Sequence, residues 1–140
     1  MDSPHALFLG LNPSTADQTS DDPTIRRCVN FTKSWGFGGL VMANLFAYRA
    51  TNPKDMLDEK DPVGISNDDA LKSLAENAGL IVCAWGAHGG HRDRDKEVFS
   101  ILKGHKLTCL GLTKDGHPRH PLYMRSDSVP IEFDINRYLK

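Results

Sequence analysis

The sequence predicts an α/β protein, a three-layer α/β/α sandwich around a central four-stranded, mainly parallel sheet. Four short apolar runs lack the alternation of a half-exposed strand, and they occupy residues 6–11, 39–46, 80–85 and 107–112. Strands that are covered on both faces show this pattern. A segment with helical period lies between each consecutive pair of runs, and this order is typical of parallel strands joined by right-handed crossovers.

The three helical segments have recognisable ends. Asp22 is suited to cap the first helix, because Pro23 then occupies the first helical position, where proline is favoured. Glycines follow the apolar stripes and are expected to end the helices. The expected boundaries are Asp22 to Gly36, Ser66 or Asn67 to Gly79, and about Asp93 to Lys103 before Gly104.

Composition indicates one soluble globular domain over residues 1–140. The net charge is −1, with 17 basic and 18 acidic residues, so the chain as a whole has no electrostatic attraction to nucleic acid, and any such affinity needs a local patch. Neither a membrane-spanning run nor a signal peptide is present, and we expect a cytoplasmic protein without membrane contact.

No metal or cofactor is expected. Cys28, Cys83 and Cys109 are far apart in apolar contexts, which favours core thiols over a metal site or disulfides. His88 and His91 lack further obvious ligands nearby. The polar stretch at residues 50–62 is interpreted as a surface loop, although loops of this length are often functional.

Polar side chains gather where the predicted strands end. Asn12, Pro13 and Ser14 follow the first strand, Asn44 ends the second, and Trp85 begins the sequence WGAH after the third. The segment TKDGHPRHPLYMR follows the fourth strand. Ligands of open parallel sheets bind at the carboxyl ends of the strands. Amides, hydroxyls, aromatic rings and histidines suit a flat ligand with hydrogen-bonding edges better than a metal ion.

Four motifs resemble those of the uracil-DNA glycosylase superfamily, especially its mismatch-specific branch. They are GLNPS, VMANLFAYRATNPKD, LIVCAWGAHG and HPLYM, in the order found in that superfamily. The motifs LNPSTAD, DDPTIRRC, NLFAYRAT, WGAHG and HPLY are still more similar to a bacterial and phage family of unknown function, DUF1643. The first resemblance implies a uracil-DNA-glycosylase-like fold and hydrolysis of an N-glycosidic bond to a pyrimidine.

The resemblance also implies roles for single residues. Asn12 would orient the attacking water, since an oxocarbenium-like transition state needs alignment more than a strong base. Asn44 would bind the base edge with one donor and one acceptor. His120 would donate to the base O2 as negative charge develops. The alternatives are an Asx turn at Asn12, backbone partners for Asn44 and a solvated His120.

Other residues would complete the pocket. Ser14, following Pro13 in the turn, would leave room for a 5-substituted pyrimidine, unless it is a turn hydroxyl. Leu122 and Tyr123 would fill the gap left by a flipped nucleotide, unless they pack the C-terminal tail. Trp85 would form part of the pocket floor. The candidates for stacking on the base, all of which also fit a core position, are Trp35, Phe37 and Phe46.

Two further functions remain open. A non-catalytic module on the same fold would bind a nucleobase, a nucleotide or DNA. A metal-dependent hydrolase would instead use the acidic cluster Asp17, Asp21 and Asp22 with His120, although these carboxylates also suit the capping of the first helix. Arg26 and Arg27 are expected to pair with the same acids rather than to bind phosphate.

Overall fold

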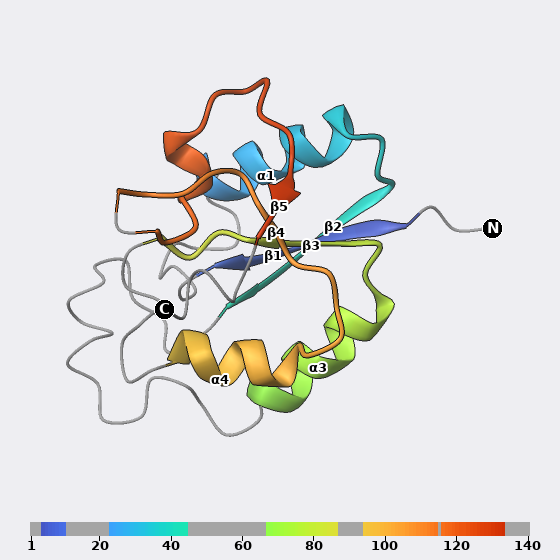
Figure 1. Cartoon of the computed structure of the whole chain (residues 1–140). Helices are drawn as coiled ribbons and strands as arrows, with labels where there is room; N and C mark the ends of the chain where they lie inside the picture. The colour runs from blue at the N-terminus through green and yellow to red at the C-terminus, as the bar shows by residue number, and fades with distance from the viewer. Residues whose placement is uncertain (1–3, 11–22, 45–66, 87–93, 115, 134–140) are drawn as a thin grey trace.

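A computed structural model describes residues 4–10, 23–44, 67–86, 94–114 and 116–133, and the statements below concern these ranges (Figure 1). Strands and helices alternate from the N-terminus to the fourth strand, as the sequence predicts. The elements are β1 (His5–Gly10), α1 (Pro23–Ser34), β2 (Gly39–Asn44), α3 (Asn67–Asn77), β3 (Leu80–Cys83), α4 (Arg94–Ile101), β4 (Thr108–Cys109), the 3-10 helix η3 (Pro121–Tyr123) and β5 (Ile131–Glu132).

The sheet has five strands in the order β2-β1-β3-β4-β5. The first four in sequence are parallel, which confirms the predicted α/β class, whereas β5 pairs antiparallel with β4. The expected number of four strands was therefore wrong. β5 has only two residues, and both are exposed, so no apolar run indicates it in the sequence.

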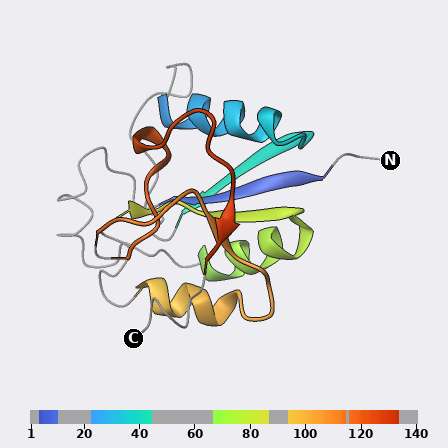
Figure 2. The ribbon, with the colours of Figure 1, turned by 45° about the horizontal axis from the view of Figure 1, so that its top comes forward.

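Helices cover both faces of the sheet. α1 lies on one face and α3 with α4 on the other, in both views of the ribbon (Figure 1, Figure 2). Phe8 and Val82 of the central strands join the apolar cluster under α1, while Leu7, Leu9 and Cys83 join the cluster under α3 and α4. Successive residues of a strand point to opposite faces, so a strand between two helical layers must be apolar throughout.

The helix boundaries follow the predicted signals. α1 begins at Pro23, and Gly36 beyond its last turn has a φ of 84°, a conformation that glycine adopts without steric cost. Gly104 after α4 has a φ of 92°. Within α1, Phe31 and Thr32 are buried, and Trp35 stacks on both Phe31 and Phe8, at centroid distances of 5.4 and 5.9 Å.

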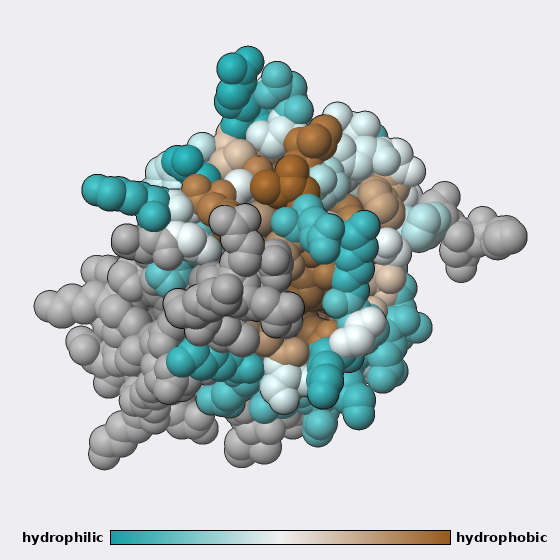
Figure 3. Space-filling view, viewed as in Figure 1, coloured by the Kyte–Doolittle hydropathy of each residue, from teal (hydrophilic) through white to brown (hydrophobic). Residues whose placement is uncertain are grey.

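Large apolar side chains also reach the surface. Figure 3 shows them gathered over β5 and the chain that leads to it. The exposed ones are Ile25, Leu112, Leu122, Tyr123, Val129 and Ile131. None of the helices in the described part of the chain is both long and apolar enough to cross a bilayer.

The three cysteines are buried free thiols, as predicted. Cys83 and Cys109 are register partners on neighbouring parallel strands. Burial raises the pKa of the Cys83 thiol well above its ordinary value, and the adjacent Cys109 raises it further. The pKa of Cys109 is also raised by burial. Both groups are therefore neutral, unreactive parts of the core.

The raised pKa of Cys83 predicts a loss of stability in alkali. The unfolded thiol releases its proton above about pH 8.5, while the folded thiol keeps it. The stabilisation is complete below that pH and is lost as the pH rises through the raised folded-state pKa. Urea unfolding between pH 7 and pH 10 should show wild type losing up to about 1.4 kcal/mol per pH unit more than Cys83→Ala. Equal pH dependence of the two proteins would contradict the assignment.

Candidate functional site

The carboxyl ends of β1, β2 and β3 lie at one edge of the sheet, because the three strands are parallel. This edge is where the sequence placed the chemistry. β1 runs between the other two, so the end of β1 at Gly10 has Asn44 on one side and the β3 end on the other. Asn12, Pro13 and Ser14, which follow β1, lie outside the described residues, so their predicted roles remain predictions.

Asn44 is the last residue of β2 and pairs in register with Gly10. Its side-chain amide lies against Gly10, because a Cβ atom built there would be 2.8 Å from Asn44 Oδ1. Gly10 thus lets the amide lie across the end of β1. The backbone carbonyl of Asn44 is bonded to the start of α3, where Asn67 donates from Nδ2 to Asn44 O over 2.9 Å.

The chain beyond β3 turns sharply at this edge. Gly86 has a φ of 78°, and its N–H donates to Pro118 O over 2.9 Å. Trp85, just before it, is only 2% exposed and packs on Phe99 and Phe133, at centroid distances of 5.7 and 6.2 Å. The indole therefore belongs to the core, and its buried ring would lie beneath the surface of a site at this edge.

The segment after β4 brings His120 to the end of β3. It first forms a small hairpin, in which Arg119 N donates to Gly111 O over 2.8 Å and Thr113 N donates to His117 O over 2.7 Å. It then passes Gly86 so closely that a Cβ atom built there would be 4.0 Å from His120 Cβ. His120 and Asn44 thus flank the end of β1 from opposite sides.

His120 has a defined orientation because it caps η3. Its Nδ1 accepts a hydrogen bond from Leu122 N over 3.2 Å. The neutral imidazole consequently carries its proton on Nε2, which is a donor. Leu122 and Tyr123 follow it with 46% and 76% of their surface exposed. The Tyr123 ring packs edge-on against the His120 ring, with centroids 6.0 Å apart.

Two predicted stacking residues lie elsewhere. A Cβ atom at Gly79 would be 3.3 Å from Phe37 Cε1, which places Phe37 at the amino end of β3, opposite the edge that carries Asn44. Phe37 and Trp35 pack against the cluster under α1, and Trp35 Nε1 donates to Ser128 O over 3.0 Å. The structure therefore does not bring either ring to the predicted site. Phe46 lies outside the described residues.

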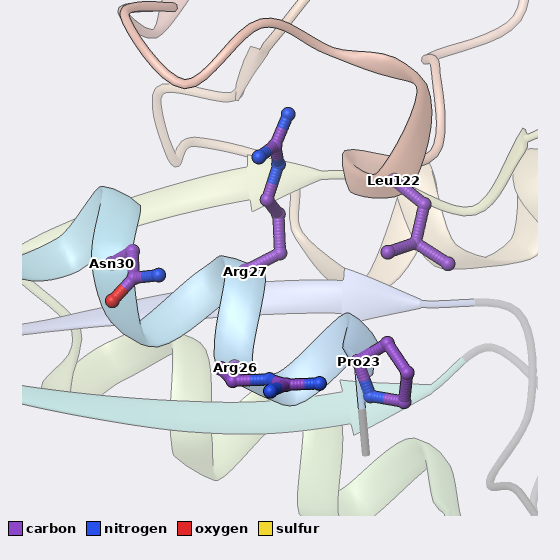
Figure 4. Close-up of a pocket in the computed structure, with 5 residues that line it drawn as sticks. All are labelled: Pro23, Arg26, Arg27, Asn30 and Leu122. Carbon is purple, nitrogen blue, oxygen red and sulfur yellow. The ribbon is translucent and has the colours of Figure 1, made fainter.

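A pocket of about 290 Å³ lies beside η3 and was not predicted. Its lining residues are Pro23, Arg26, Arg27, Asn30 and Leu122 (Figure 4). The four from α1 have the spacing i, i+3, i+4 and i+7, which places them on one face of the helix. This periodicity is visible in the sequence, but it does not predict the pocket, because the pocket forms only where η3, about 90 residues later, packs beside α1.

Metal chemistry gains no support from the described ranges, which contain no cluster of three His, Cys, Asp or Glu side chains suited to a metal ion. The proposed acidic ligands Asp17, Asp21 and Asp22 lie outside these ranges, as do His88 and His91. Arg27, which was expected to pair with the acids, donates from Nη2 to Met124 O. Its guanidinium also lies over the Phe31 ring, 5.6 Å from the centroid.

Contact between Gly10 and Asn44 predicts a local effect of Gly10→Ala. The new methyl group would displace the Asn44 amide at a cost of about 1 kcal/mol, because a terminal side-chain group can move. Gly39→Ala is the matched control, since a Cβ atom there would be an ordinary 3.6 Å from His5 Cβ. The Asn44 side-chain NH2 resonances in ¹H–¹⁵N spectra should shift in Gly10→Ala only. Unchanged resonances in both variants would contradict this packing.

Comparison with known proteins identifies one family. Neither a search of curated proteins nor a search of solved structures found a match. The model of the family described as "Protein of unknown function (DUF1643)" matches residues 1–122, which include β1 to β4 and the His-Pro-Leu sequence at the start of η3. That match covers most of the chain and agrees with the motifs noted in the sequence, so the protein belongs to the DUF1643 family.

Proposed function

We propose that the protein hydrolyses the N-glycosidic bond of a pyrimidine nucleotide, with the base held at the carboxyl edge of β1, β2 and β3. The observation that carries the proposal is the placement of Asn44 and His120 on either side of the β1 end. Neighbouring strands are about 4.8 Å apart, so the two flanking strands are separated by roughly 10 Å. A planar base fits a gap of this order between an amide and an imidazole.

Asn44 supplies the recognition of the base in this proposal. Its amide presents a donor and an acceptor in one plane, which matches the N3 and O4 edge of a pyrimidine. Gly10 and Asn67 support this role, because one gives the amide room and the other fixes the backbone behind it. A small Ser14 after Pro13 would admit a 5-substituted base, as the resemblance to uracil-DNA glycosylases implies.

Asn12 and His120 supply the chemistry. Asn12 follows Gly10 by two residues, and its amide would orient a water toward C1′ of the sugar. The water oxygen bonds to C1′, the C1′–N1 bond breaks, and its electron pair leaves with the base. The Nε2–H of His120 would stabilise the negative charge on base O2, and the water proton finally neutralises the departing base.

A non-catalytic nucleobase- or nucleotide-binding module is the second candidate. It needs only hydrogen-bonding groups at the described edge, which the Asn44 amide at the end of β2 and the His120 imidazole before η3 supply. These groups are sufficient for binding, whereas hydrolysis additionally depends on the water held by Asn12. The two candidates therefore differ in turnover and not in recognition.

Base release from oligonucleotides tests the catalytic proposal. Uracil, mismatched and 5-substituted pyrimidines in single- and double-stranded DNA should be converted to abasic sites by wild type. Asn12→Ala should lower the rate at least 100-fold, the range of a lost positioning or proton-handling group. His120→Asn should also lower it about 100-fold, because the imidazole donor is lost while a side-chain oxygen remains to cap η3.

The control is His120→Ala, which removes both the donor and the cap. Equal rates in His120→Asn and His120→Ala would assign the loss to the imidazole rather than to the position of η3. Intact substrates throughout, together with a raised melting temperature on adding a nucleobase or nucleotide, would reject hydrolysis and support the binding module. Asn44→Ala should abolish that stabilisation under either candidate.

A further inference from the structure

We propose that Tyr123 is a positioning residue for His120, and that its ring holds the imidazole in one orientation at the carboxyl edge of the sheet. The two rings are inclined at 61° to each other, with their centroids 6.0 Å apart, which is an edge-to-face arrangement. Aromatic pairs favour this geometry at such distances. The ring pair gives Tyr123 a role that the sequence did not predict.

The 3-10 geometry of η3 brings the two rings together. Tyr123 N donates to His120 O over 3.0 Å, which is the hydrogen bond between residues i+3 and i of a 3-10 turn. Side chains three residues apart are eclipsed in such a turn, whereas in an α-helix they are offset around the axis. Pro121 is buried at the start of the turn, where its fixed φ suits the geometry and no N–H is needed. The sequence His-Pro-Leu-Tyr therefore places its fourth side chain over its first.

The Tyr123 ring adds a second constraint to an imidazole that is already bonded at one atom. His120 Nδ1 accepts from Leu122 N over 3.2 Å. A hydrogen bond of this length fixes the position of Nδ1 but allows the imidazole to tilt about that atom. A second ring packed against the imidazole restricts the tilt. The two contacts together determine the direction in which the Nε2–H bond points.

Tyr123 belongs to the surface and not to the core. Its exposed fraction is 76%, whereas His120 is half-buried. Met124 N donates to Pro121 O over 3.2 Å and closes the turn, so the backbone that carries the tyrosine is held. A tyrosine side chain has only two rotatable torsions, so a held backbone limits the positions of the ring. Substitution of such an exposed side chain should leave the fold intact, and its effect can then be assigned to the neighbouring imidazole.

The importance of this orientation for catalysis rests on the proposed function. The Nε2–H of His120 would stabilise the negative charge on base O2, and such a donor is effective only when it is aimed at the oxygen before the reaction begins. Misplacement of a catalytic group by about 1 Å can lower a rate about 100-fold, and a tilt that leaves Nδ1 in place should cost about tenfold. Because Tyr123 acts through His120, the loss should appear in kcat rather than in KM.

The test compares Tyr123→Leu, which removes the ring, with Tyr123→Phe, which keeps it, in the full chain. Val129→Ala is the control, because Val129 is also exposed and lies outside η3. The imidazole ¹⁵N resonances are recorded at a pH where histidine is neutral and are assigned with His120→Asn. Wild type, Tyr123→Phe and Val129→Ala should show the Nε2–H form of His120. In Tyr123→Leu the two ¹⁵N shifts should move toward each other, because the Nδ1 bond weakens and the two tautomers mix.

Base release from oligonucleotides supplies a second measurement. Tyr123→Leu should lower kcat about tenfold and leave KM within about twofold, while Tyr123→Phe and Val129→Ala should match wild type. Unchanged ¹⁵N shifts in Tyr123→Leu, or an unchanged kcat with or without a raised KM, would overturn the positioning role. If wild type releases no base, the proposed hydrolysis is rejected, and the imidazole spectra decide by themselves whether Tyr123 holds His120.

Discussion

The complete burial of β1 is the constraint on which the rest of the structure depends. β1 pairs with β2 and β3 on its two sides, and helices cover both faces, so Ala6 to Leu9 expose no surface. A polar side chain inside this strand would lose its water without gaining a partner. Polar groups can therefore gather only where the strand ends, and at Gly10, the last residue of β1, the Asn44 amide lies in the space that a Cβ atom would take.

This constraint also explains how much of the fold is predictable from the sequence. Burial on two faces imposes continuous apolar runs, and the helices between them have clear end signals, so the order of residues is enough to locate β1 to β3 and the three helices. The sequence indicated Asn44 as a candidate site residue because an amide at the end of an apolar strand requires hydrogen-bond partners. The position of His120 at the same edge followed from the parallel topology together with its place after the fourth apolar run.

The unpredicted parts depend on contacts between segments distant in sequence. β5 consists of two exposed residues, and they form a strand only because they pair with β4 at the edge of the sheet. Phe37 was predicted as a candidate for stacking on a base, but it follows the turn after α1 and lies at the amino end of β3, where it packs beside Gly79. Asn67 was expected only as a possible helix cap, and its bond to Asn44 O depends on the packing of α3 below β2. Periodicity within one element cannot supply such information.

The segment after β4 is bonded to the rest of the structure at two points. Pro118 O accepts from Gly86 at the end of β3, and Met124 O accepts from Arg27 on α1. Between these anchors lie His120, whose Nδ1 accepts from Leu122 N, and Leu122, which lines the α1 pocket. The segment is therefore positioned by the sheet and by α1 together. The position of His120 therefore depends on the contact of this segment with α1 as well as on its contact with the chain after β3.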